Sequence, residues 1–242
     1  MLIGKNLSKS WGSTRALEDV DVEIEPGKIT VLIGPSGSGK TTLIRTLSLL
    51  EPPDHGVISL GDHEYRFPLP LETPITPPWP DVTVVFQQLF LWPHLRLREN
   101  ITLPLQNRAR DDSEDRLNEL IEAFDMKHFI DRYPNETSLG QRQRAALVRA
   151  LVLNPSYILL DEITSALDVE QVSIILKQLQ ELRSRGIGIL LVTHLIGFAG
   201  RAADKVIFLD NGKVAEAGSS QILIQPKTAR LRRFLSVVEA AR

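Results

Sequence analysis

The feature that most constrains this chain is a glycine-rich segment, residues 34–41, with the sequence GPSGSGKT. An apolar run, Ile29–Ile33, precedes it, and a stretch typical of a helix, residues 42–50, follows it. Glycines let backbone N–H groups turn inward around phosphate oxygens, and the start of a helix adds a positive dipole end. Lys40 supplies a mobile positive charge, and the Thr41 hydroxyl can bind Mg²⁺. The segment therefore predicts a phosphate-binding loop between a strand and a helix, rather than an incidental glycine-rich turn.

Length and composition limit the class of protein. A chain of 242 residues is long enough for one large α/β domain with a substantial core. The absence of cysteine rules out disulfides, thiolate metal sites and a cysteine nucleophile, and a net charge of -2 argues against broad electrostatic binding to nucleic acid. No stretch approaches 18 consecutive apolar residues, and the N-terminus lacks the pattern of a signal peptide. We expect a cytosolic protein, with any membrane role supplied by a partner.

Strands and helices alternate through most of the remaining chain. We expect strands over residues 2–7, 16–24, 57–60, 82–86, 157–162 and 187–193, helices over 113–126, 141–153 and 168–185, and a hairpin over 206–216. The tail, residues 227–242, reads as a basic amphipathic helix that folds back on the sheet.

Two segments do not fit this alternation. Six prolines between residues 68 and 80 exclude a helix or a central strand there. Residues 89–95 combine large apolar side chains with a proline, so they form either the core of a lobe or a docking site.

Polar side chains follow two of the expected strands. Asp161 and Glu162 end one apolar strand, and His194 follows another. The carboxyl ends of parallel strands share one edge of a sheet, where the phosphate-binding loop also lies. Two carboxylates there suit Mg²⁺ coordination and water activation. The alternatives are a solvated acidic strand end and a structural histidine.

Two further positions could contact a nucleotide. Ser138 and Gly140 lie where the first amides of a helix are unsatisfied, so an anion could bind there, although Ser138 could also be only a helix cap. Trp11 could stack on a nucleotide base or fill the core of a lobe.

Taken in order, these segments resemble the nucleotide-binding subunits of ABC transporters over nearly the whole chain. The segments look like the family's Walker A loop (34–41), Q-loop glutamine (Gln87), signature sequence (137–141), Walker B motif (158–162), D-loop (165–168) and switch histidine (His194). Within the family, residues 85–95 and 232–235 look most like importers of polar amino acids.

The resemblance implies an α/β fold. A P-loop NTPase (RecA-like) core with a mostly parallel sheet would carry an N-terminal antiparallel β lobe and an inserted α-helical lobe. Residues 1–242 would form a single ABC ATPase domain. The catalytic core with its β lobe would occupy residues 1–87 and 155–242, and the helical lobe with the signature would occupy 88–154.

The resemblance also implies a mechanism in which two subunits sandwich two ATP molecules. Catalysis would depend on Glu162 as general base, with His194 and Gln87 also at the reacting phosphate. Mg²⁺ would be held by Thr41, Gln87 and Asp161. The nucleotide would contact Trp11, Ala16, Ser36, Gly37, Ser38, Gly39, Lys40, Thr41 and Thr42 of one subunit, and Ser138, Gly140, Gln141 and Asp168 would complete the sandwich.

The implied function is ATP hydrolysis that energises solute transport, with import of amino acids or similar polar solutes favoured. The expected partners are transmembrane permease subunits, a second ABC subunit (identical or different) and an extracytoplasmic solute-binding protein, with no nucleic acid. This places the chain at the cytoplasmic face of the cell membrane. The alternatives are a soluble ABC ATPase acting on nucleic acid or ribosomes, and a slow regulatory ABC subunit with a degenerate signature.

Three positions depart from the family's pattern. Thr137 and Leu139 replace the leucine and first glycine of the usual Leu-Ser-Gly-Gly-Gln signature, and Ile163 replaces a proline. If that glycine's backbone needs a positive φ, leucine costs about 1 to 2 kcal/mol there. We expect a working ATPase whose rate these departures can lower.

Overall fold

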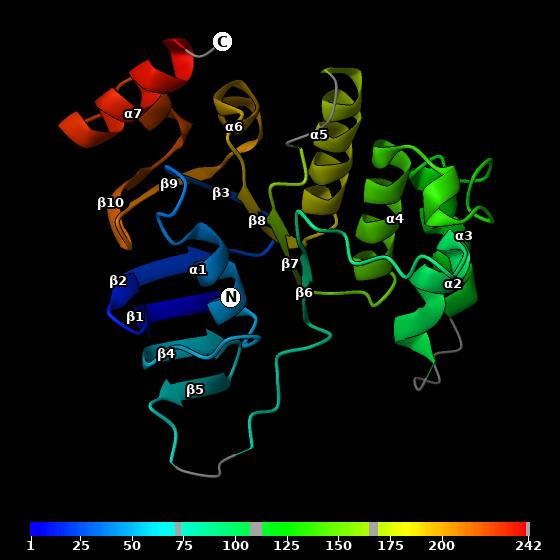
Figure 1. The fold of residues 1–242 in the computed structure, drawn as a ribbon, viewed down its shortest axis with the longest axis horizontal. Coiled ribbons are helices and arrows are strands. Elements are labelled where there is room, and N and C mark those ends of the chain that lie inside the picture. The colour runs from blue at the N-terminus through cyan, green and yellow to red at the C-terminus, as the bar shows by residue number, and fades with distance from the viewer. Residues whose placement is uncertain (71–73, 107–112, 165–168, 241–242) are drawn as a thin grey trace.

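The computed structural model describes residues 1–70, 74–106, 113–164 and 169–240. Its centre is a six-stranded sheet in the order β10-β9-β3-β8-β7-β6 (Figure 1). The strands are β3 (Ile29–Ile33), β6 (Val82–Val85), β7 (Tyr157–Asp161), β8 (Gly188–Val192), β9 (Lys205–Asp210) and β10 (Lys213–Gly218). All neighbours pair in parallel except β9 and β10, which form the predicted hairpin. The α/β fold with a mostly parallel sheet is confirmed.

A second, antiparallel sheet forms the N-terminal lobe. Its order is β2-β1-β4-β5, from β1 (Leu2–Trp11), β2 (Thr14–Ile24), β4 (His55–Leu60) and β5 (His63–Phe67). The helices of the described chain are α1 (Lys40–Leu47), α2 (Leu97–Thr102), α3 (Ser113–Ala123), α4 (Leu139–Leu151), α5 (Val169–Ser184), α6 (Ile196–Ala202) and α7 (Ala229–Ala240). Short 3₁₀ turns are η1 (Leu103–Leu105), η2 (Pro134–Glu136) and η3 (Ser220–Leu223).

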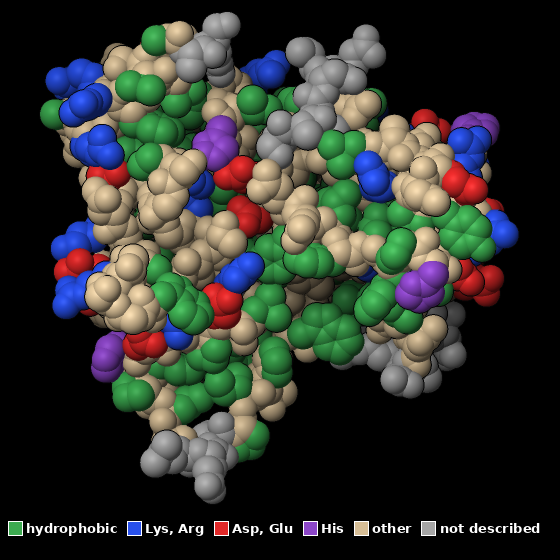
Figure 2. Space-filling view, in the orientation of Figure 1, with side chains coloured by type: hydrophobic (Ala, Val, Ile, Leu, Met, Phe, Trp, Pro, Cys, Tyr) green, Lys and Arg blue, Asp and Glu red, His purple; other side chains and the backbone are tan. Residues whose placement is uncertain are grey.

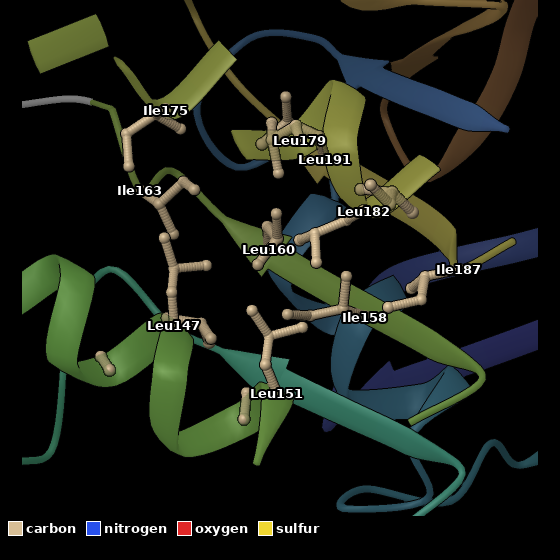
Figure 3. Close-up of a cluster of buried hydrophobic side chains, with 14 of the residues drawn as sticks. Leu147, Leu151, Ile158, Leu160, Ile163, Ile175, Leu179, Leu182, Ile187 and Leu191 are labelled. Carbon is tan, nitrogen blue, oxygen red and sulfur yellow. The ribbon is translucent and has the colours of Figure 1, made fainter. Parts of the chain in front are cut away.

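The six-stranded sheet is buried on both faces. In β7, Ile158 and Leu160 belong to one hydrophobic cluster, and Leu159 between them belongs to another. Figure 3 shows Ile158 and Leu160 facing Leu151 of α4, with Leu179 of α5 beside them. Because successive side chains of a strand point to opposite faces, a strand buried on both sides needs an uninterrupted apolar run. This explains why the central strands read as continuous apolar segments.

The helices α2 and α3 lie beyond α4, away from the six-stranded sheet (Figure 1). They meet the rest of the protein through α4, which packs its buried face, including Leu147 and Leu151, against β7 (Figure 3). The division of the chain at residues 88–154 into a helical lobe and a core stays a prediction.

Several predicted boundaries need correction. Helix α1 begins at Lys40, not at residue 42, and ends at Leu47, because Leu49 has a left-handed φ of 56° that no helix continues through. The first strand is longer than the predicted residues 2–7, since Trp11 ends β1 and pairs with Thr14. The tail prediction is confirmed, since α7 buries Leu231 and packs Phe234 5.2 Å from Phe208, ring centre to ring centre.

Candidate active site

The predicted phosphate-binding loop connects β3 to α1. It contains Ser36 and Gly37, both exposed, and its last residue is Gly39, which has a φ of 104°. A Cβ at Gly39 would lie only 2.3 Å from the carbonyl oxygen of Ala16 in β2. Glycine is therefore required there twice over, by backbone conformation and by space. The close approach also places Ala16 against the end of the loop. A contact of Ala16 with the nucleotide stays a prediction.

Lys40 is buried at the start of α1. Its Nζ donates to the carbonyl oxygens of Gly34 at 2.9 Å and Pro35 at 3.0 Å. Burial lowers the pKa of Lys40, while Glu162 and Asp161 act to raise it. Lys40 thus presents a desolvated positive charge at a helix N-terminus, an arrangement that attracts phosphate.

Asp161 and Thr41 form an oxygen-rich pair beside this lysine. Thr41 Oγ1 donates to Asp161 Oδ2 at 2.8 Å, and Asp161 is only 5% exposed. Burial raises the pKa of Asp161, opposed by the Thr41 hydrogen bond and reinforced by the neighbouring Glu162. Asp161 Oδ1 is buried with no hydrogen-bond partner in the described part of the chain. A buried carboxylate oxygen without a partner, next to a hydroxyl, fits a hard cation such as Mg²⁺.

The donor set fits Mg²⁺ better than a metal held entirely by protein. Residues 1–70, 74–106, 113–164 and 169–240 contain no group of three or more His, Cys, Asp or Glu side chains that could hold a metal ion. Mg²⁺ usually keeps several waters and takes one or two carboxylates plus phosphate oxygens of a substrate. Thr41 and Asp161 provide that smaller share.

Glu162 and His194 meet across the ends of β7 and β8. His194 Nε2 lies 2.5 Å from Glu162 Oε1, and the Glu162 amide donates to the Val192 carbonyl at 3.1 Å. Glu162 has a φ of 53°, which turns it out of the strand direction set by Asp161. Left-handed residues other than glycine are strained and cluster at functional sites. A carboxylate oriented by a histidine is suited to accept a proton from water.

Acidic, basic and histidine side chains adjoin in the upper middle of the face shown in Figure 2. Gln87 reaches the same edge of the sheet, because it follows β6, the strand paired with β7. Trp11 is 51% exposed, with Lys9 Nζ 4.9 Å from its ring centre, so the prediction that it could fill a lobe core is wrong.

The signature residues lie at the start of α4. The Gln141 amide donates to Ser138 Oγ at 3.3 Å, and the Ser138 amide donates to Gln141 Oε1 at 3.0 Å. This is a capping box, so Ser138 does act as a helix cap. Leu139 is the first helical residue, with no positive φ. The backbone cost considered for Leu139 therefore does not arise, and only its bulk remains.

The structure brings together the loop with Lys40 and Thr41, the acids Asp161 and Glu162, and His194. No hydrogen bond joins the signature side chains to them in the described chain, since those of Ser138 and Gln141 stay within their own capping box. The D-loop with Asp168 lies outside the described residues. The sequence reasoning missed Arg149 of α4, whose signal was an arginine within an apolar helical stretch.

Comparisons with known proteins point to one family. The profile of the family described as "ABC transporter" matches residues 17–165. The arginine transport ATP-binding protein ArtP of Haemophilus influenzae is 40% identical over 237 residues, which cover 96% of this chain and 98% of ArtP. The L-cystine import ATP-binding protein TcyC of Bacillus subtilis is 39% identical, covering 98% of each chain.

A solved structure gives the same assignment. The dimeric, post-hydrolysis state of an ATP-binding cassette bound to ADP and Pi is 31% identical, with a TM-score of 0.78 over 91% of this chain and 99% of that one. The chain belongs to the ABC transporter family and is an ATP-binding, ATP-hydrolysing subunit of a transporter.

Proposed function

We propose that this chain hydrolyses ATP to drive import of amino acids through partner permease subunits. The observation that carries the proposal is the Glu162–His194 pair, which lies at the strand ends beside Lys40 and Thr41. The names of ArtP and TcyC, for arginine transport and L-cystine import, support amino acids as the solute class. Nothing in the comparisons favours action on nucleic acid or ribosomes.

The residues of one chain would bind and orient ATP. Ser36, Gly37, Ser38 and Thr42 would surround the phosphates together with Gly39 and Lys40, and the exposed ring of Trp11 would stack on the base. Lys40 would exchange its present carbonyl partners for phosphate oxygens. Thr41, Asp161 and Gln87 would hold Mg²⁺, which when bound neutralises charge on the phosphates.

Glu162 would then take the proton of the attacking water. Its Oε1 already lies within hydrogen-bond reach of His194 Nε2, so the imidazole can hold the carboxylate in place and contact the γ-phosphate. Asp161 has a different partner, since its Oδ2 accepts from Thr41 Oγ1 at 2.8 Å. The two adjacent acids thus divide metal binding and proton transfer between them.

A second subunit would complete the site. Ser138, Gly140, Gln141 and Asp168 would close over the nucleotide bound by the partner, with the N-terminus of the 13-residue helix α4 directed at the γ-phosphate. The dimeric arrangement of the related cassette with ADP and Pi supports this. Within one described chain, the Ser138 and Gln141 side chains bond only to their own capping box.

Membrane attachment would come through the permease. Among the described residues, no helix is both long and apolar enough to cross a bilayer. An apolar groove of about 460 Å³, lined by residues that include Leu50, Pro77, Trp79, Phe86 and Leu153, would receive a short permease helix on the cytoplasmic side. Hydrophobic side chains gather in a hollow in the lower middle of Figure 2. An extracytoplasmic solute-binding protein would deliver the solute.

The Glu162→Gln variant tests the proposal. Loss of a general base lowers rates by about 10² to 10⁴, so ATP hydrolysis should fall by that factor while ATP binding persists. Sedimentation velocity should then show an ATP-dependent shift from monomer to dimer. Glu181→Gln, which alters a carboxylate on α5, is the matched control and should hydrolyse ATP at the wild-type rate.

Two results would count against parts of the proposal. Wild-type hydrolysis by Glu162→Gln would remove Glu162 from the role of base. A Glu162→Gln chain that binds ATP but stays monomeric would mean that closure needs a different ABC subunit or the permease.

A further inference from the structure

Arg149 of α4 holds two backbone carbonyls of a distant segment. Its two terminal nitrogens donate to Leu89 O at 2.6 Å and to Phe90 O at 2.7 Å. Burial lowers the pKa of Arg149. None of the ion pairs found in the described residues includes this side chain. Burying a charge is unfavourable unless its donors are satisfied. A largely desolvated guanidinium that donates to two backbone carbonyls therefore indicates that the position of those carbonyls is important to the protein.

The carbonyls that Arg149 holds belong to a strained turn directly after Gln87. Phe90 has a left-handed φ of 48° and is 61% exposed. Its ring meets the edge of Phe86, on the other side of Gln87, at 6.0 Å between centres. A non-glycine residue keeps such a conformation only when its surroundings impose it. Arg149 imposes it here by fixing the carbonyls of Leu89 and Phe90 together.

Arg149 also connects this turn to the signature. It lies near the end of α4, the helix that begins just after Ser138. A regular helix moves as one body, so any displacement of Ser138 toward a nucleotide carries Arg149 with it. Arg149 also lines the apolar groove described above, as does Phe86.

We propose that Arg149 is a positioning residue that sets the place of Gln87 and couples it to the signature helix. This rests on the proposed function, in which Gln87 is a ligand of Mg²⁺. Removal of a group that holds a metal ligand in place typically lowers metal affinity or activity by about 10- to 100-fold. Arg149 acts through Leu89 and Phe90 and does not itself touch the nucleotide.

The same helix offers a matched control. Arg144 is also partly buried on α4 and donates to two carbonyls, Phe124 O at 3.1 Å and Asp125 O at 3.2 Å. Those carbonyls follow α3 and do not belong to the Gln87 turn. Arg144 also pairs with the Asp125 carboxylate at 3.8 Å, so Arg144→Met removes an ion pair in addition to hydrogen bonds to carbonyls. Only Arg149→Met releases the turn after Gln87.

The test measures the affinity of the non-hydrolysing Glu162→Gln chain for Mn²⁺ in the presence of ATP, with electron paramagnetic resonance as the readout. Arg149→Met should weaken Mn²⁺ binding by about tenfold. Arg149→Lys, which can still donate to one carbonyl, should give an intermediate affinity. Arg144→Met should bind as the parent does. Unchanged affinity in Arg149→Met, or an equal loss in Arg144→Met, would overturn the proposal.

A double-variant cycle separates this inference from the role of Gln87 itself. If Arg149 acts through Gln87, adding Arg149→Met to Gln87→Ala should change Mn²⁺ affinity no further. If Arg149→Met and Gln87→Ala each lower Mn²⁺ affinity and their factors multiply in the double variant, the inference is overturned and the metal role of Gln87 is left intact. If Gln87→Ala alone binds Mn²⁺ as tightly as the parent, the metal role of Gln87 is wrong, and an Arg149 effect that survives there overturns the inference too.

Discussion

Two glycines of the phosphate-binding loop allow a direct comparison of backbone strain with steric fit. Gly37 and Gly39 have φ values of 76° and 104°, both unfavourable for a residue with a Cβ. A Cβ at Gly37 would meet nothing within 4 Å. A Cβ at Gly39 would lie 2.3 Å from the Ala16 carbonyl oxygen and 3.1 Å from Leu17 Cδ2. We expect Gly37→Ala and Gly39→Ala to differ in stability for this reason.

The structure sets the size of the difference. A left-handed φ costs an L-residue about 1 to 2 kcal/mol, and both variants incur this. The overlap at Gly39 is with the carbonyl of Ala16 in β2, and two residues further along that strand the Glu18 amide donates to the Gly212 carbonyl at 2.9 Å. That backbone cannot swing aside as a side chain would, so overpacking should add about 1 to 3 kcal/mol. We expect losses of about 1 to 2 kcal/mol for Gly37→Ala and about 2 to 5 kcal/mol for Gly39→Ala.

Urea unfolding without nucleotide measures both values, so that effects on ATP binding do not enter. The slopes of free energy against urea should match that of the wild type, which would show that the unfolded state is unchanged. Equal losses in the two variants would refute the steric argument at Ala16. A larger loss of unfolding free energy in Gly37→Ala than in Gly39→Ala would mean that a Cβ at Gly37 does meet neighbouring atoms.

Two further substitutions test buried carboxylates. Burial raises the pKa of Asp161 above its ordinary 3.8, so the folded chain holds the carboxyl proton more tightly than the unfolded chain does. Stability therefore falls as pH rises from the ordinary pKa to the raised one. At pH 7 the free energy of unfolding of Asp161→Asn should therefore exceed that of the wild type by about 1 kcal/mol, while ATPase activity is lost. A lower free energy of unfolding than that of the wild type would contradict this. At Glu216, burial acts to raise the pKa, but hydrogen bonds from Thr228 and Lys227 outweigh it and lower the pKa below 4.5. Glu216→Gln should lower the free energy of unfolding by about 1 to 2 kcal/mol at pH 7, and the difference from the wild type should shrink as pH falls through that lowered pKa. If the same difference persists in acid, the hydrogen bonds to the Glu216 carboxylate are not its source.

The parts of the site that follow from local chemistry could be predicted from the sequence. The loop at residues 34–41 and the acids after β7 carry their chemistry in short segments, and parallel strands bring their carboxyl ends to one edge. The fold was predictable for the same reason, since buried strands such as β8 read as apolar runs.

Features that depend on distant contacts could not be predicted. Helix α2 is only six residues long, too short to show a helical period. The φ of Leu139 depends on where α4 begins. The capping box of Ser138 and Gln141 makes Leu139 the first residue of that helix. The partners of Arg149 lie about 60 residues away, so no local pattern reveals them.

The two-sided burial of β7 also links the assembly of the protein to its chemistry. Ile158 and Leu160 serve one core and Leu159 the other, and the same alternation decides which acid faces Thr41. One residue inserted into or deleted from β7 would exchange both cores and move Asp161 off its hydroxyl partner at the same step. A chain with the wrong spacing would thus fail to fold before it could misplace its carboxylates, so selection for a stable sheet also preserves the spacing of the acids.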